Sequence, residues 1–299
     1  MPIFETLEPA ILTIDVPRGG VRVIASDRTG TAGPRNFVVR AVEDTRAGGV
    51  VHRLLGGRHS LPLSIALHLV PGVLIVVAYL LVGEPFADAI GYPAFLGWAI
   101  ALCLVLIPIL LGLLWFGRMR NGRFSLRGVL DYIDKPVPCG KLVAMVIPLI
   151  VWMMVAGLAL APVNTFVKGF FTWLPYAGGG NGNNSYLDGH SHSIMLTTLV
   201  ICLPLTGISL PLIEELYFRG FLLPRIAHLG RWAPVLSTVL FSLYHFWSPW
   251  AFVSRVIFTF PGYWLAWRHK DIRLSIGMHV GSASIAATFG TIAVALNLI

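Results

Sequence analysis

Long apolar runs separated by short polar connections dominate the chain from residue 61 onward. A helix needs about 20 apolar residues to cross roughly 30 Å of hydrocarbon. Stretches of this kind predict seven transmembrane helices, at about 61–82, 94–116, 141–162, 194–228, 232–248, 251–267 and 272–298. The fourth stretch is too long for one straight span and contains three prolines, so we expect it to be kinked or divided and leave an eighth crossing open.

Composition supports lipid as the solvent for most of the chain. Hydrophobic residues make up 56% of the sequence and charged residues 12%, whereas soluble domains carry about 25% charge. The net charge of +8 does not indicate a nucleic-acid binder, because such proteins do not carry several membrane-length apolar runs. We therefore expect membrane lipid, and no nucleic acid, as a partner, with basic loops facing anionic headgroups.

Loop charges predict how the helices are oriented. The connection 117–141 is rich in Arg and Lys, whereas 83–93 has neither. Basic loops stay in the cytoplasm, so the N-terminus is expected inside and, with seven spans, the C-terminus outside. Residues 1–60 are polar and broken by Gly and Pro, which indicates a flexible cytoplasmic extension before a transmembrane domain at 61–299. The expected location is the cell membrane, and the inner membrane for a bacterial source.

Two adjacent carboxylates, Glu214 and Glu215, are the only acidic residues within the predicted spans. An ionised group in a bilayer costs several kcal/mol and is a functional hypothesis by default, although a pair at a helix end near the interface is the plain alternative. Glu215 and Arg219 have the i,i+4 spacing that favours an ion pair. Glu214 points about 100° away on a helix and is left free. The pattern predicts a structural ion pair, Glu215–Arg219, beside a working Glu214.

Two histidines are predicted to approach Glu214. A turn is predicted at Gly230. Glu214 lies 230 − 214 = 16 residues before it and His245 lies 245 − 230 = 15 residues after it, so a helical hairpin places the two at similar depth. His279 follows the basic turn at Lys270 on the last apolar stretch. Each histidine has the plain alternative of a hydrogen-bonded packing residue. Together with Glu214 they could activate water, as a base with hydrogen-bond partners or as metal ligands.

These residues resemble the signature of the CPBP intramembrane proteases, also called the type II CAAX prenyl endopeptidase and bacteriocin-processing family. The family pattern is E-E-x-x-x-R, then F-x-x-x-H, then a histidine on a later helix. The chain reads Glu214–Arg219, Phe241–His245 and His279 in that order, on three successive apolar stretches. The resemblance covers roughly residues 195–290 and implies an all-helical membrane fold.

The family implies that Glu214 and His245 activate a water for peptide hydrolysis and that His279 helps to stabilise the oxyanion. A family asparagine four residues after the last histidine is replaced here by Ala283, and Ser282 is a candidate substitute donor. Family members are described both as metalloproteases and as metal-independent glutamic proteases. Glu214, His245 and His279 would match the three protein ligands of a catalytic zinc by residue type. We expect no metal to be required, with zinc as the alternative.

The expected function is an intramembrane endopeptidase that cleaves peptides or membrane-protein substrates. A proton-coupled transporter or channel, with Glu214 and Glu215 as a protonation relay, is one alternative. A catalytically silent membrane scaffold of the same family is another, and Ala283 is the residue that favours it. The sequence gives neither the cleavage site nor the oligomeric state.

Overall fold

The computed structural model describes residues 12–15, 22–25, 46–134, 136–176 and 186–298. The chain divides into two compact units, Met1–Arg53 and Leu54–Ile299. Most of the predicted N-terminal extension, 1–60, lies outside the described residues, so its flexibility and its cytoplasmic location stay predictions. The first unit contains an antiparallel hairpin that the sequence pattern did not predict, with strands β1 (Leu12–Asp15) and β2 (Arg22–Ala25).

The second unit is built from helices, which confirms the predicted all-helical membrane fold. After α1 (Arg46–Leu54), which ends at the start of this unit, the α-helices are α2 (Leu61–Ala78), α3 (Glu84–Ala89), α4 (Ala94–Asn121), α5 (Cys139–Lys168), α6 (His192–Cys202), α7 (Leu210–Glu215), α8 (Leu223–Arg225), α9 (Trp232–Tyr244), α10 (Phe252–His269) and α11 (Arg273–Ala295). Three π-helical segments join neighbouring helices, at Tyr79–Gly83, Leu203–Ser209 and Leu216–Leu222. Short 3₁₀ turns occur at Gly169–Phe171, Ala227–Leu229 and Pro249–Ala251.

Within the described part of the chain, five helical stretches are long and apolar enough to cross a membrane, and α9 is a shorter apolar helix. The five are Leu61–Ala89, Ala94–Asn121, Cys139–Phe171, His192–Arg225 and Arg273–Ala295. Helix occurs in all seven stretches predicted to be spans. The number of crossings and the orientation of the N-terminus stay predictions.

The long fourth stretch continues as helix from His192 to Arg225 and contains two π-helical segments. Pro204 and Pro211 each stand second in a new segment, so the missing N–H groups coincide with the changes of winding. The six-residue helix α7 carries both glutamates and has a π-helical segment on either side. Such π-helical turns are frequently found at functional sites.

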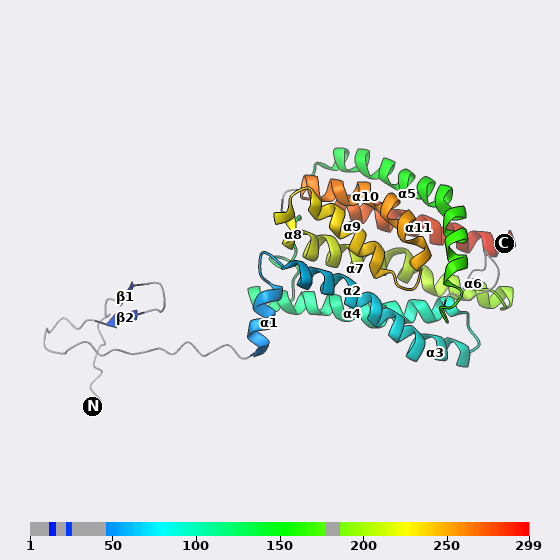
Figure 1. The fold of residues 1–299 in the computed structure, drawn as a ribbon, viewed down its shortest axis with the longest axis horizontal. Coiled ribbons are helices and arrows are strands. Elements are labelled where there is room, and N and C mark those ends of the chain that lie inside the picture. Colours follow the sequence, from blue (N-terminus) through cyan, green and yellow to red (C-terminus); the bar gives the residue numbers. More distant parts are fainter. Residues whose placement is uncertain (1–11, 16–21, 26–45, 135, 177–185, 299) are drawn as a thin grey trace, which may run out of the picture. The chain divides into compact units, whose positions relative to one another are not determined.

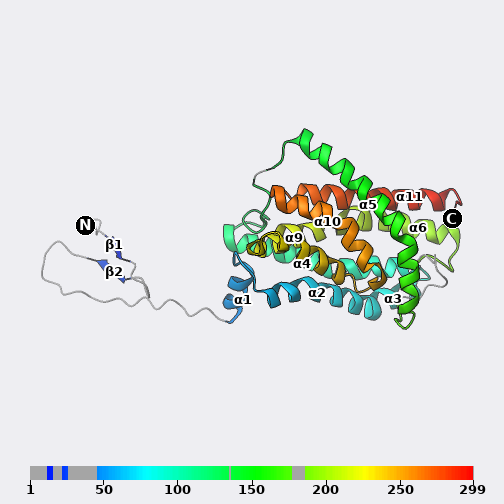
Figure 2. The same cartoon turned by 45° about the horizontal axis from the view of Figure 1, so that its top comes forward.

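Helix α7 lies inside the bundle, beside α11 and α4 (Figures 1 and 2). Helix α10 packs between α9 and α5, and α5 also covers α11. Side chains from these helices form one aromatic core that includes Phe218, Phe221, Phe241, Tyr244 and Tyr263. The glutamates of α7 are buried beside this core, with Glu214 6% and Glu215 0% exposed.

Close contact between α2 and the end of α9 fixes the backbone near His245. Gly72 of α2 faces the carbonyl oxygen of Tyr244, and a Cβ at this position would collide with it and come within 2.9 Å of the Phe246 ring. Only glycine permits this approach. The contact holds the last turn of α9 against the bundle.

A loop junction, defined by Val137, Asp271 and Arg273, ties the segment before α5 to the turn between α10 and α11. The Asp271 carboxylate accepts hydrogen bonds from the backbone N–H of Val137 at 2.7 Å and of Arg273 at 3.0 Å. The Arg273 guanidinium lies 2.7 Å from Asp271 Oδ2 and donates to the carbonyl of Val137. Polar groups at this end of the bundle are thus well supplied with partners.

Candidate active site

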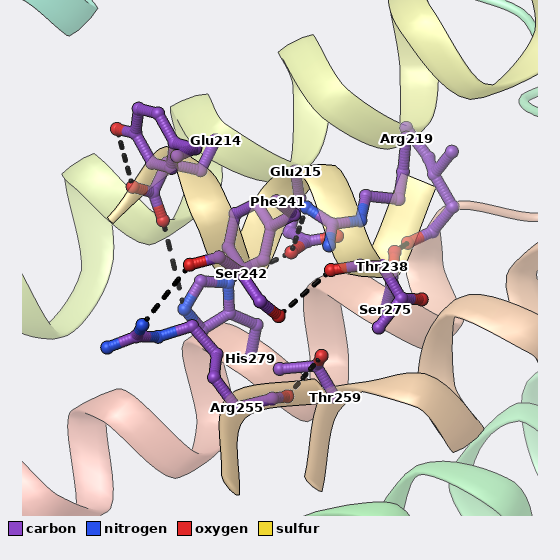
Figure 3. Close-up of polar contacts among 12 residues, drawn as sticks. Glu214, Glu215, Arg219, Thr238, Phe241, Ser242, Arg255, Thr259, Ser275 and His279 are labelled. Atoms are coloured by element: carbon purple, nitrogen blue, oxygen red, sulfur yellow. Dashed lines mark hydrogen bonds and ion pairs between the residues drawn. The ribbon is translucent and has the colours of Figure 1, made fainter. Parts of the chain in front are cut away.

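Glu214 is a buried carboxylate with two different neighbours. Its side chain points into the bundle from α7, and only 6% of the residue is exposed. The hydroxyl of Tyr244, at the end of α9, donates to Glu214 Oε1 at 3.0 Å. The other oxygen, Oε2, lies 3.9 Å from His279 Nε2 of α11 (Figure 3). Glu214 is therefore positioned by two other helices and is not in a tight ion pair.

Glu215 is bound more tightly, through the i,i+4 spacing noted in the sequence. Glu215 and Arg219 are both 0% exposed, and Glu215 Oε1 lies 3.5 Å from Arg219 Nη1. His279 Nδ1 donates to the same carboxylate oxygen at 2.9 Å, since an ionised carboxylate can only accept. One imidazole ring thus faces both glutamates, and its nearer nitrogen is committed to Glu215.

Arg219 occupies a slot between aromatic rings. Its guanidinium carbon lies 3.9 Å from the ring centroid of Phe241 and 3.2 Å from that of Tyr263. In the described part of the chain, none of its side-chain nitrogens has a hydrogen-bond partner, so the contact with Glu215 is an ion pair without a formed hydrogen bond. The cation is therefore stabilised by Glu215 and by the ring faces.

His245 lies beside this cluster, at the point where α9 ends. The residue leaves the helical conformation, with φ −79° and ψ 59°, so the helix stops at Tyr244 rather than at the predicted 248. Its Nδ1 donates to the carbonyl of Phe241 at 2.8 Å, which leaves Nε2 as an acceptor in the neutral ring. The Phe241 ring lies 4.7 Å from the His245 ring and 6.0 Å from that of His279. The structure thus brings His279 into contact with both glutamates. Both histidine rings pack against Phe241, and the His245 ring also lies 4.8 Å from that of Tyr244, the donor to Glu214.

Two site residues were missed by sequence reasoning. One is Tyr244, directly before the motif histidine, whose hydrogen bond to Glu214 depends on how α9 packs against α7. The other is Arg255 of α10, which interacts electrostatically with Glu214. An arginine within the predicted span 251–267 was a signal that could have been used, because cations are costly in a membrane.

Ser282, the candidate oxyanion donor, is directed elsewhere. Its hydroxyl donates to the carbonyl of His279 at 3.1 Å and lies 3.0 Å from the sulfur of Met153 in α5. Ala283 has no polar side-chain atom, and its backbone packs near Gly207. Neither residue presents a donor to Glu214 among the described contacts.

The residues named as alternative zinc ligands have other partners in the structure, and the expectation that no metal is required stays a prediction. Within the described residues, no group of three or more His, Cys, Asp or Glu side chains is placed to hold one. His279 directs Nδ1 at Glu215 and Nε2 at Glu214, and His245 uses Nδ1 on a backbone carbonyl. The three-ligand set Glu214, His245 and His279 is therefore not assembled as a zinc site.

The fold and the cluster define a class: a multi-pass helical membrane protein with a buried glutamate–histidine–arginine site. Residues 196–285 match the family model described as type II CAAX prenyl endopeptidase Rce1-like. This match confirms the resemblance to the CPBP membrane proteases, and it covers every residue of the cluster. Comparisons with curated proteins and with solved structures found no match.

Proposed function

We propose that this chain is an intramembrane endopeptidase in which Glu214 activates the attacking water. One observation carries the proposal: of two adjacent buried glutamates, Glu215 is committed to Arg219, whereas Glu214 is held by the Tyr244 hydroxyl and keeps one oxygen unbonded at 3.9 Å from His279. A general base must be positioned and must also have a free lone pair. Glu215 also has an oxygen without a partner, Oε2, but its charge is paired with Arg219 and the residue is 0% exposed, whereas Glu214 has no such pair and is 6% exposed.

In the proposed reaction, Glu214 takes a proton from water while the water oxygen bonds to the peptide carbonyl carbon. The carbonyl π electrons move to oxygen and form an oxyanion. When the intermediate collapses, the C=O bond re-forms, the C–N bond breaks, and the proton held by Glu214 passes to the leaving nitrogen. The products are a carboxylic acid and an amine, so the enzyme returns to its starting state.

His245 supports this chemistry as a second acceptor for the water. Its Nδ1 proton is used on the carbonyl of Phe241, so Nε2 has a lone pair available. His279 orients the glutamates: its bond to Glu215 fixes the ring that faces Glu214. We assign Glu214 and His245 to water activation and His279 to positioning.

The proposed substrates are peptides or membrane-protein segments that reach the site from the cytoplasmic side or laterally through lipid. The reaction is written without a metal because the site residues are not arranged as a ligand set. Activity is therefore expected to survive dialysis against a chelator. The proposed setting is the cell membrane, with lipid as the surrounding partner.

The test is hydrolysis of a proteome-derived peptide library by the purified parent protein, with products read by mass spectrometry. Glu214→Gln should fold but lose at least about 10²-fold in rate, because an amide cannot accept the proton of water. Glu84→Gln is the matched control: Glu84 also accepts a tyrosine hydroxyl, from Tyr79 at 3.3 Å, but lies outside the cluster. It should cleave at the parent rate.

Full activity of folded Glu214→Gln would overturn the assignment. A parent protein that cleaves nothing, yet carries protons across proteoliposomes in a Glu214-dependent manner, would establish the transporter alternative. A folded parent with neither activity would indicate the silent scaffold.

A further inference from the structure

A second arginine of the cluster, Arg255, has no part in the chemistry described so far. Its helix α10 packs against α9, and the half-buried side chain leaves α10 on the side of the His279 ring where the Glu214 carboxylate lies (Figure 3). Arg255 and Glu214 interact electrostatically. Among the described residues, this cation has no salt bridge with a carboxylate, and it lies on the same side of the His279 ring as the proposed general base.

We propose that Arg255 donates to the oxyanion of the tetrahedral intermediate and so supplies the hydrogen bond that Ala283 cannot make. The inference rests on the proposed peptidase function and names a further catalytic residue of that site. A guanidinium carries five N–H donors in a planar fork. Permanent charge near a developing oxyanion is worth far more in a dry site than in water.

The contacts of Arg255 leave donors available. Nη2 donates to the Ser248 hydroxyl at 2.8 Å, and Nη1 lies 3.5 Å from the carbonyl of Ser242, at the limit of a hydrogen bond. Both partners belong to the end of α9 and the turn that follows it. These contacts hold the guanidinium in place and occupy two of its five N–H groups, within the described chain.

Three other candidate donors are less suitable. In the neutral His279 ring the one N–H group, at Nδ1, is used on Glu215, so Nε2 has no proton to donate. Arg219 is 0% exposed and enclosed between the Phe241 and Tyr263 rings, so a substrate carbonyl cannot reach it. Ser282 donates to the carbonyl of His279. Among the cationic side chains of the cluster, Arg255 is the one that is half-buried rather than enclosed.

Arg255 acts only through hydrogen bonds during the reaction. As the water oxygen bonds to carbon and Glu214 takes the water proton, the carbonyl oxygen gains negative charge. Arg255 donates one or two N–H hydrogen bonds to that oxygen and keeps its own protons throughout. When the intermediate collapses, the oxyanion electron pair re-forms the C=O bond, the C–N bond breaks and Glu214 gives its proton to the leaving nitrogen. The oxygen loses its negative charge, so its hydrogen bonds to Arg255 weaken.

The experiment compares kcat and KM for Arg255→Gln and Arg255→Lys, per folded protein, on one peptide cleaved by the parent. Arg255→Gln should lower kcat by about 10²- to 10³-fold and leave KM within a few-fold, because the bond forms only in the transition state. Arg255→Lys should retain part of the rate, since it keeps the charge but not the fork. The matched control Arg268→Gln, at an exposed position on the same helix, should cleave at the parent rate.

A double substitution tests the link to position 283. Ala283→Asn should raise kcat more in the Arg255→Gln background than in the parent, because the restored amide would replace the lost donor. Equal kcat for the parent and the Arg255 variants would overturn the inference and leave the peptidase proposal intact. A raised KM at unchanged kcat would also overturn it, and would indicate substrate binding by Arg255. If Arg255→Gln does not fold, the kcat and KM of Arg255→Lys are compared with those of the parent in the same way. A parent protein without activity would contradict the peptidase proposal itself.

Discussion

Two ion pairs of the same chemical type occupy contrasting environments. In the site, Glu215 and Arg219 are both 0% exposed and 3.5 Å apart. At the loop junction, Asp271 and Arg273 are 2.7 Å apart, and the arginine side chain is 37% exposed. At the junction, Asp271 also accepts hydrogen bonds from two backbone N–H groups. In the site, the Arg219 guanidinium contacts aromatic rings and has no hydrogen-bond acceptor in the described chain.

The difference shows what each pair depends on. If the junction pair is broken, the half-exposed Arg273 can still be solvated by water, and the buried Asp271 keeps its backbone N–H donors. A site charge that loses its partner is left buried among rings, at a cost of several kcal/mol. The Glu215–Arg219 pair therefore adds little net stability, but removing either partner alone is costly. Because Glu215 is paired in this way, Glu214 is the carboxylate available for chemistry.

The largest expected effect on stability comes from breaking the site pair. Glu215→Gln leaves Arg219 without its counter-charge and weakens the bond to His279, so the free energy of unfolding should fall by about 3 to 5 kcal/mol. Thermal unfolding of the purified protein in detergent measures this change. An unchanged melting temperature would mean that the rings alone stabilise Arg219.

The matched control removes both charges. Glu215→Leu combined with Arg219→Met should recover much of the stability lost by Glu215→Gln, because no buried charge remains. A double variant as unstable as the single one would show that shape rather than charge decides the effect.

A smaller effect is expected at the loop junction. Asp271→Asn should cost about 1 to 3 kcal/mol of unfolding free energy, because hydrogen bonds to a charged acceptor become bonds to a neutral one. Unfolding of this variant and of the parent in the same detergent gives the difference. A loss as large as that of Glu215→Gln would remove the contrast between the two pairs.

The junction should also carry a pH dependence. Burial raises the pKa of Asp271, but hydrogen bonds from the Arg273 side chain and from the backbone N–H groups of Val137 and Arg273 outweigh it, so the pKa lies below its ordinary value. A depressed pKa contributes stability above the unfolded-state value of about 3.9, and this is lost as pH falls through the folded-state value. The gap between the parent and Asp271→Asn should therefore narrow below about pH 4. A stability difference between the two proteins that stays constant with pH would show that it does not arise from the lowered pKa of Asp271.

The smallest effect is expected for Ser282→Ala. The hydroxyl bonds the carbonyl of its own helix, so its loss should cost about 1 kcal/mol or less in stability and change the cleavage rate by less than about two-fold. Single-turnover rates of this variant and the parent decide the matter. A ten-fold loss of rate would return Ser282 to the role of oxyanion donor.

Sequence patterns predicted the features that depend on neighbours along one helix. Apolar length predicted where helices form, and the i,i+4 spacing of Glu215 and Arg219 brought those side chains together. Gly230 lies at the hairpin turn with φ +59°, a conformation suited to glycine.

The remaining features depend on packing between helices, which periodicity does not encode. The bond from Tyr244 to Glu214, the position of Arg255 and the rings around Arg219 all arise from contacts among separate helices. The π-helical segments on either side of α7 also change which way side chains point, so angles counted on an ideal helix apply only within that short piece.

The central claim is that water adds to a peptide carbonyl under the control of Glu214, and isotope labelling tests it directly. The folded parent and Glu214→Gln proteins would be incubated with one cleavable peptide in water enriched in ¹⁸O, and the new C-terminal fragment weighed by mass spectrometry. The parent should yield a fragment with one ¹⁸O atom in its new carboxyl group, and Glu214→Gln should yield at least about 10²-fold less of it in the same time. Equal yields of labelled fragment from the two proteins would contradict the claim.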